Sequence, residues 1–210
     1  INTRYRDREG SYDDIAEIIL ETVQAHKGNY MVFFSSYAYC REVYDRFSEI
    51  CGAEISCVMQ KNNMTEQERE EFLNQFQEDP EQTMTAFCVL GGIFSEGIDL
   101  QGDRLIGTIV VGVGLPQVGP EQDVIRDYYD EHSHMGFAYA YQYPGMNKVL
   151  QAVGRVIRGE NDRGVAVLID ERFSGFSYQA LFPKHWSHFC RIQKPGDLTH
   201  QLNLFWKNKL

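Results

Sequence analysis

Short apolar runs alternate with amphipathic stretches along most of the chain. Apolar residues that recur every three or four positions predict helices, whereas a short continuous apolar run predicts a strand buried on both faces. The predicted helices are 12–26, 38–51, a segment that opens after Thr65, the acidic stretch 121–131 and a segment from about Gly145 to Arg158, and the predicted strands are 30–34, 54–59, 84–90, 105–113 and 164–169. This alternation predicts a three-layer α/β domain with a mostly parallel sheet.

Polar residues at the predicted helix boundaries support these assignments. Ser11 is a predicted N-cap, and Thr65-Glu-Gln-Glu68 has the pattern of a capping box. Gly28 and Pro80 stand just beyond the ends of the first and third helices. Because no internal repeat or long linker interrupts the pattern, we expect residues 1–210 to form one domain.

Small and polar residues follow three of the predicted strands. These segments are Ser35–Tyr37, Gly91–Asp99 and Gly114–Pro116. In a parallel sheet the functional groups gather beyond the carboxyl ends of the strands. We therefore expect the three segments on one rim, and we expect the helix that holds Gln151 to bring its polar side to the same rim.

That helix carries the most distinctive polar pattern of the chain. Gln151, Arg155 and Arg158 are separated by four and three positions, which places them on one side of a helix. The opposite side carries Met146, Leu150, Val153 and Ile157. Guanidinium groups suit phosphate oxygens and the charge that develops in phosphoryl transfer. On spacing alone, an ordinary amphipathic helix with solvated arginines is the favoured explanation.

Charge and composition limit the classes of function. The formal net charge of −10 and a pI near 5.0 argue against a broad basic surface for nucleic acid, so any such binding must be local. The sequence holds no apolar run of membrane-spanning length and no signal-peptide pattern. We therefore expect an intracellular protein, cytoplasmic or nuclear, without a membrane partner.

Cysteine and histidine patterns do not predict a metal site. The five cysteines are an odd number without a C-x-x-C pair, which is typical of reduced structural cysteine. The pairs His132/His134 and His185/His188 lack a third ligand at a usual spacing.

The glycine-rich segment Gly91-Gly-Ile-Phe-Ser-Glu-Gly-Ile-Asp-Leu100 could bring its backbone close to a phosphate or a ribose. It is not a Walker A loop, because G-x-x-x-x-G-K-[ST] occurs nowhere in the chain. A plain loop whose acidic residues cap neighbouring backbone is the simpler alternative. In the same way, Ser35–Tyr37 alone could be only a strand-to-helix N-cap.

Taken together and in order, these segments resemble the second motor domain of the DinG/XPD-like branch of superfamily 2 helicases, and the resemblance covers nearly the whole chain. The segments that carry it are Phe33-Phe-Ser-Ser-Tyr37, Gly91–Leu100, Gly114-Leu-Pro116, Gln151-Ala-Val-Gly-Arg-Val-Ile-Arg158, Asp162-Arg-Gly164 and Asp170-Glu-Arg172. The resemblance implies a RecA-like fold and a part in an ATP-dependent DNA helicase.

The resemblance also implies roles for individual residues. Arg155 and Arg158, with Gln151, match the catalytic motif whose arginines reach the γ-phosphate of ATP on a partner motor domain. The positions implied to face the nucleotide are Glu96, Gly97, Asp99 and Gly154. The positions implied to contact single-stranded DNA are Ser35, Ser36, Tyr37, Gly92 and Ser95.

The sequence also departs from a complete motor of this branch. The Walker A loop, the Walker B acidic pair and the cysteines of an iron–sulfur cluster are absent, and they would belong to a first motor domain. We therefore expect ATP and Mg²⁺ to be held mainly by that first motor domain, and the chain alone to be inactive. Proteins of repair complexes are further expected partners. The alternative is a RecA-like docking module that binds protein or nucleic acid without catalysis.

Overall fold

The computed structural model describes residues 1–94, 100, 102–157, 162–194 and 196–208. Its strands form one five-stranded sheet in the order β2-β3-β1-β4-β5, and every neighbouring pair is parallel. In chain order the strands are β1 (Asn29–Phe34), β2 (Ile55–Met59), β3 (Thr83–Val89), β4 (Gly107–Val111) and β5 (Val165–Ile169). The predicted α/β fold is confirmed, and the sheet is wholly parallel where a mostly parallel one was expected.

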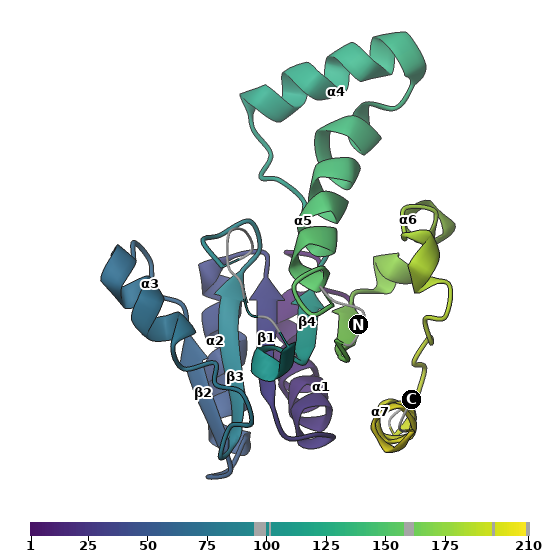
Figure 1. The fold of residues 1–210 in the computed structure, drawn as a ribbon. Helices are drawn as coiled ribbons and strands as arrows, with labels where there is room; N and C mark the ends of the chain where they lie inside the picture. Colours follow the sequence, from purple (N-terminus) through teal and green to yellow (C-terminus); the bar gives the residue numbers. More distant parts are fainter. Residues whose placement is uncertain (95–99, 101, 158–161, 195, 209–210) are drawn as a thin grey trace.

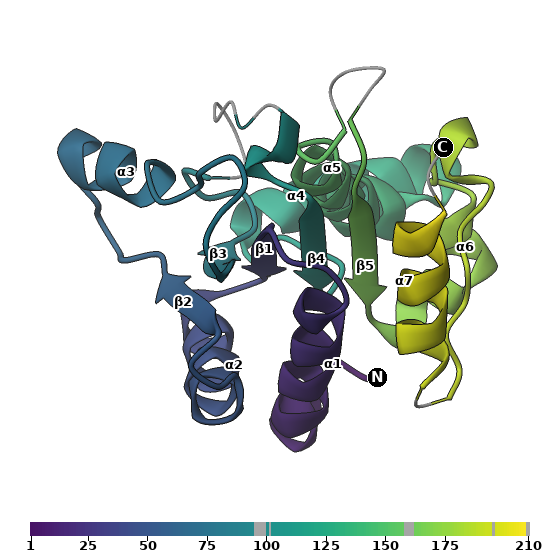
Figure 2. The ribbon, with the colours of Figure 1, turned by 60° about the horizontal axis from the view of Figure 1, so that its bottom comes forward.

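Helices cover both faces of this sheet, as Figure 2 shows. One face carries α1 and α2, and the other carries α3 and α5, while α4 projects away from the sheet (Figure 1). The α-helices are α1 (Tyr12–Gln24), α2 (Tyr37–Ile50), α3 (Glu66–Leu73), α4 (Pro120–Ser133), α5 (Tyr143–Val153), α6 (Phe176–Gln179) and α7 (Asp197–Lys207). Shorter turns are η1 (Arg8–Ser11), η2 (Gly102–Arg104), the π-helical η3 (Ala138–Gln142), η4 (Glu171–Ser174) and η5 (Lys184–Trp186).

The sheet has two cores because side chains of a strand alternate between its faces. Met31 and Phe33 of β1 belong to the cluster under α5, and Tyr30 and Val32 belong to the cluster under α1 and α2. All six residues of β1 and all seven of β3 are buried. This two-sided burial explains why the central strands are almost continuously apolar in sequence.

Most predicted boundaries lie close to the observed ones, and the caps explain them. The Thr65–Glu68 capping box is present with both of its reciprocal hydrogen bonds, so that prediction is confirmed. Ser11 does precede α1, but its hydroxyl donates to the Arg8 carbonyl oxygen at 2.7 Å and makes no cap hydrogen bond. The capping role predicted for Ser11 is therefore wrong, because the preceding 3₁₀ turn takes up its hydroxyl.

The helix that was expected to reach Arg158 ends earlier, at Val153. Gly154 closes it, and the Gly154 amide donates to the Leu150 carbonyl oxygen at 2.9 Å. Arg155 therefore lies outside the helix, and Ile157, which was predicted to face the core, is 51% exposed. The predicted stripe of Gln151, Arg155 and Arg158 on one helix face is wrong, and Arg158 itself lies outside the described residues.

The direction of α5 also corrects the expected position of its polar end. Gly145, in its first turn, lies against Gly114 and the Val113 carbonyl oxygen, just beyond the carboxyl end of β4. Val156, just past α5, lies against Gly164 at the entry to β5, which is the amino edge of the sheet. A helix that joins two parallel strands must carry the chain back in this way. The segment around Arg155 is therefore not on the carboxyl rim.

Candidate functional site

A buried glutamine joins three elements at the carboxyl edge of the sheet. Gln60 follows β2 and is 1% exposed. Its side-chain oxygen accepts a hydrogen bond from the Val89 amide at 3.1 Å, and its Nε2 donates to the Tyr37 hydroxyl at 2.7 Å. The backbone amide of Gln60 donates to Phe87 at 2.8 Å. Gln60 therefore fixes the ends of β2 and β3 and the start of α2 relative to one another.

The glycine pair after β3 packs directly on this glutamine. Gly91 has φ +70°, a backbone conformation that favours glycine. A Cβ at Gly92 would lie 2.9 Å from the Val89 carbonyl oxygen and 3.3 Å from Gln60 Nε2, so a larger residue would not fit. Gly92 and Tyr37, both predicted to contact DNA, are thus brought together through Gln60.

The other residues predicted to contact nucleic acid are Ser35, Ser36 and Ser95. Ser36 is the N-cap of α2, and its hydroxyl oxygen accepts a hydrogen bond from the Tyr39 amide at 3.3 Å. The simpler N-cap interpretation is therefore confirmed for Ser36, although its hydroxyl proton remains available to a ligand. Ser35 is exposed at the same edge. Ser95 lies outside the described residues.

Burial sets the protonation of Tyr37. Its partial burial raises the pKa of the phenol, the nearby Cys88 and Cys40 raise it further, and the hydrogen bond from Gln60 lowers it by less. The Tyr37 hydroxyl therefore keeps its proton at neutral pH. Since Gln60 already donates to its oxygen, the Tyr37 proton can be offered to an acceptor outside the protein.

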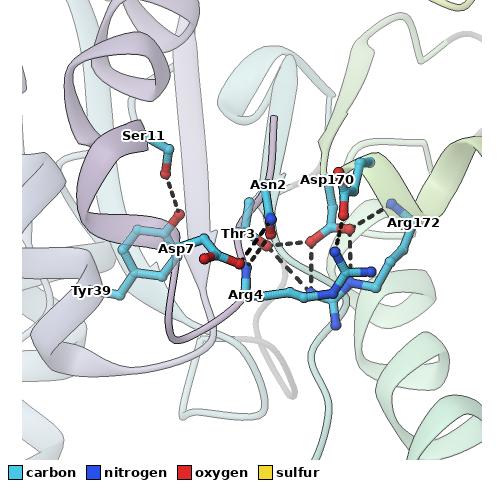
Figure 3. Close-up of polar contacts among 9 residues, drawn as sticks. Asn2, Thr3, Arg4, Asp7, Ser11, Tyr39, Asp170 and Arg172 are labelled. Carbon is cyan, nitrogen blue, oxygen red and sulfur yellow. Dashed lines mark hydrogen bonds and ion pairs between the residues drawn. The ribbon is translucent and has the colours of Figure 1, made fainter.

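A second polar cluster lies at the end of β5 (Figure 3). Asp170, which is 7% exposed, accepts hydrogen bonds from the Arg172 amide at 2.7 Å, from Arg172 Nε at 2.8 Å and from Arg172 Nη2 at 2.7 Å. The Thr3 hydroxyl also donates to this carboxylate. Burial raises the pKa of Asp170, but the hydrogen bonds from Arg172 and Thr3 together outweigh it and hold the pKa below its ordinary value.

The same cluster holds the first residues of the chain against β5. The Glu171 amide donates to the Ile1 carbonyl oxygen at 2.8 Å, and the Glu171 carboxylate pairs with Arg4. Figure 3 also shows a separate hydrogen bond between the Ser11 and Tyr39 hydroxyls, which lie 3.4 Å apart. The polar groups of this cluster therefore bond within the protein.

The end of α5 holds the described part of the predicted catalytic motif. Gln151 and Gly154 are exposed, and Arg155 is partly exposed. Beneath them Ala152 and Val153 are buried in the core that they share with Phe94 and Leu100 of the glycine-rich crossover. The predicted nucleotide-facing residues Glu96, Gly97 and Asp99 lie outside the described residues. Phe94, Leu100 and the end of α5 therefore pack on the same face of the sheet.

Sequence reasoning missed Gln60 and Lys148. Gln60 directly follows a strand, so the rule that placed Ser35–Tyr37 on the rim also applies to it. Lys148 precedes Gln151 by three positions and therefore shares its side of α5. Lys148 therefore extends the polar side of α5 from Gln151 toward the rim.

The described residues form neither a metal-binding cluster nor a membrane-spanning helix. Within the described part of the chain, no group of three or more His, Cys, Asp or Glu residues is arranged to hold a metal ion. None of the helices described combines the length and the apolar character needed to cross a bilayer. All five cysteines have free thiols.

Comparisons with known proteins identify relatives over most of the chain. The helicase C-terminal domain family matches residues 19–189. A probable ATP-dependent helicase of Methanocaldococcus jannaschii is 27% identical over 186 residues, which cover 80% of this chain and 27% of that protein. The ATP-dependent DNA helicase YoaA of Haemophilus influenzae is 27% identical over 200 residues, which cover 94% of this chain and 29% of that protein.

Solved structures agree on the fold. An XPD helicase structure matches with a TM-score of 0.69 at 18% identity, over 86% of this chain and 32% of that one. A second, described as XPD in its apo form, matches with a TM-score of 0.67 at 20% identity, over 86% of this chain and 36% of that one. At such identities the likeness concerns the RecA-like fold, and the chain spans less than a third of the length of the two sequence relatives above.

Proposed function

The chain belongs to the helicase C-terminal domain family, and we propose that it is the second motor domain of an ATP-dependent DNA helicase. In this proposal it supplies arginine fingers for ATP hydrolysis and contacts to single-stranded DNA for translocation. The observation that supports it best is the family match across residues 19–189, which includes both the Tyr37 edge and the Gln151–Arg155 segment.

The arginines would act on charge that develops during phosphoryl transfer. Arg155 and Arg158 carry fixed positive charge, and a guanidinium fork matches the equatorial oxygens of a γ-phosphoryl group. Gln151 is exposed on the last turn of α5 and would orient groups beside them. The buried side of the same turn, Ala152 and Val153, anchors that end of the helix on the sheet.

The residues present fit only one side of a nucleotide site. No phosphate-binding loop occurs in the sequence, so nothing in the chain matches the cradle that holds the β-phosphate and Mg²⁺. A first motor domain would therefore hold ATP and Mg²⁺. Glu96, Gly97, Asp99 and Gly154 would then face the nucleotide across the cleft between the two domains.

The Tyr37 edge would contact single-stranded DNA. The hydroxyl protons of Ser36 and Tyr37, close to the tight Gly91–Gly92 turn, would be the local hydrogen-bond donors. Local contacts of this kind suit an acidic protein, because single strands bind in narrow grooves as well as on broad basic surfaces.

The two sites would be linked by closure of the cleft. Hydrolysis requires the fingers to approach ATP on the other domain, and product release allows the domains to separate. With each domain holding the DNA strand in turn, these cycles would move the protein along it. Since α5 begins near the proposed DNA edge and ends just before Arg155, it would connect the two events within this domain.

Replacement of the finger arginines tests the proposal. In the full-length polypeptide, or after a first motor domain is restored, we expect Arg158→Ala and Arg155→Ala each to lower kcat for ATP by about 10³-fold, with little change in nucleotide affinity. The contact is made mainly in the transition state, so steady-state kinetics and nucleotide binding together measure it.

Arg163→Ala is the matched control, because its guanidinium stacks on Phe205 at 4.6 Å and lies in the same connection between α5 and β5. Unchanged turnover in the Arg155 and Arg158 variants would favour a docking module instead. Rapid ATP hydrolysis by the isolated 210 residues would also contradict the assigned roles.

A further inference from the structure

We propose that Lys148 binds the phosphate backbone of single-stranded nucleic acid where the strand crosses the Gly91–Gly92 turn. The proposal rests on the proposed function and deepens it, because it adds a charged contact to the DNA edge. Lys148 lies in the second turn of α5, on the same side as Gln151 but closer to the carboxyl edge of the sheet.

The side chain of Lys148 lies flat on Gly91. A Cβ built on Gly91 would be 3.2 Å from Lys148 Cε, 3.3 Å from Cδ and 3.6 Å from Nζ. Any other residue at Gly91 would displace the lysine stem, and it would also have to adopt φ +70°. The glycine thus provides the space in which the lysine crosses from α5 to the end of β3.

The ammonium group has no partner among the described residues. In the described part of the chain, no carboxylate lies within ion-pair distance of Lys148 and no acceptor takes a hydrogen bond from it. An unpaired, partly exposed ammonium is notable in a chain with a net charge of −10. Its three donors are therefore free for an anion.

Lys148 continues a strip of donors along the edge. On the far side of the glycine turn, Gln60 contacts Gly92 and holds the Tyr37 hydroxyl at 2.7 Å. Lys148, Gly91–Gly92, Gln60 and Tyr37 are therefore consecutive neighbours across the ends of β3, β2 and β1. A strand of phosphodiesters that follows this strip would meet the Tyr37 proton and then the ammonium.

The same geometry favours the nucleic-acid backbone over the phosphates of ATP. Both are phosphate oxygens, and an ammonium suits either. Lys148 reaches the carboxyl edge, whereas the chain past α5 returns to the amino edge, where Val156 contacts Gly164. Lys148 and Val153, the last residue of α5, are five positions apart, which is about 7.5 Å along the helix, and Arg155 follows beyond that end. Lys148 therefore lies at the same edge as Tyr37, where nucleic acid is proposed to bind.

Binding of labelled oligo(dT) tests the role of the charge. For Lys148→Gln we expect about fivefold weaker binding at low salt, and a slope of log affinity against log salt that is smaller by about 0.7, the value for one lost phosphate contact on a single strand. Lys148→Arg should retain most of the wild-type affinity and most of the wild-type salt slope. Lys27→Gln is the control with an equal charge change, since Lys27 lies at the amino edge and pairs with Asp79 at 3.2 Å.

The outcomes separate this inference from the proposed function. If the unmodified protein binds no oligo(dT), the proposed function fails. If it binds oligo(dT) but Lys148→Gln matches Lys27→Gln in affinity and slope, only the role of Lys148 is overturned. Melting temperatures of the variants show whether each remains folded.

Lysine acetylation identifies the ligand without a substitution. We expect oligo(dT) to protect Lys148 from an amine-reactive reagent, read by mass spectrometry, and to leave Lys27 reactive. Protection of Lys148 by Mg-ATP and not by oligo(dT) would overturn the proposal in favour of the nucleotide.

Discussion

The carboxyl edge of the sheet carries two polar clusters that differ in how their hydrogen bonds are used. At β5, the Asp170 carboxylate receives its donors from Arg172 and Thr3 of the same chain. At β1 and β3, Tyr37 offers a proton and Lys148 offers an ammonium with no acceptor in the described part of the chain. Both clusters are rich in polar groups, but the donors around Asp170 are directed at a carboxylate of the same chain, whereas Tyr37 and Lys148 direct theirs away from the described residues.

This difference separates polar groups that stabilise the fold from polar groups that are available to a ligand. A buried charge that is fully paired stabilises a local arrangement, here the contact between the start of the chain and η4. When a phosphate replaces water beside donors that have no acceptor among the described residues, no hydrogen bond between those residues has to break. We therefore assign the β5 cluster to stability and the β1–β3 edge to ligand binding, and variants in each cluster should affect different measurements.

The largest effect on stability is expected from Asp170→Ala. It leaves the Arg172 guanidinium, 19% exposed, without its carboxylate, and we expect a loss of about 3 kcal/mol, the lower end for broken buried pairs. Denaturant unfolding measures this loss. Oligo(dT) affinity should not change under conditions where the variant is folded. Weaker DNA binding by the folded variant would remove the distinction between the clusters.

The pH dependence of this effect has a defined sign. The folded pKa of Asp170 lies below its ordinary value of 3.8, so the ionised carboxylate contributes stability above that pH and loses it as the pH falls toward the folded pKa. The stability difference between wild type and Asp170→Ala should therefore narrow below about pH 4. A constant difference down to acid pH would contradict the pairing.

Gln60→Ala should lower both the stability of the protein and its affinity for DNA. It leaves the buried Val89 amide without the side-chain oxygen of Gln60, a loss of about 2 kcal/mol, and it frees Tyr37 from its fixed position, so DNA affinity should fall as well. Gln67→Ala is the control, because Gln67 is exposed and its side chain donates to the exposed Glu71 carboxylate. Gln60→Ala with unchanged DNA affinity would show that Tyr37 is not positioned by Gln60.

The smallest expected effects are those of Ser36→Ala and Tyr37→Phe, and they should appear in different measurements. Ser36→Ala removes the N-cap of α2, and we expect a loss of about 1 kcal/mol of stability. Tyr37→Phe removes the proton offered to DNA, so it should weaken oligo(dT) binding and the DNA stimulation of ATPase. If Tyr37→Phe changes only the melting temperature, the edge has a capping role and no more.

Much of the fold could be predicted from the sequence because local patterns and tertiary packing agree. Strands β1 and β3 are buried on both faces, and their apolar runs show it directly. The end of α5 could not be found this way. The apolar spacing continues from Val153 to Ile157, but the chain has to turn after Gly154 to enter β5, and this tertiary requirement overrides the local pattern.

The site was predictable in part for a related reason. Residues that directly follow a strand, such as Ser36 and Tyr37, are placed by the topology alone. Contacts between distant segments leave no local signal. The Thr3–Asp170 hydrogen bond joins residues 167 positions apart, and the Lys148–Gly91 contact depends on how α5 packs over β3.

The most direct test of the motor assignment is ATP hydrolysis by the full-length protein, measured as a function of single-stranded DNA concentration. We predict that Arg158→Ala lowers the maximal rate and leaves the half-saturating DNA concentration unchanged, whereas Lys148→Gln raises the half-saturating concentration and leaves the maximal rate unchanged. If both variants change the same parameter, or if Arg158→Ala retains the full maximal rate, the assignment of the two ends of α5 to nucleotide and DNA is contradicted.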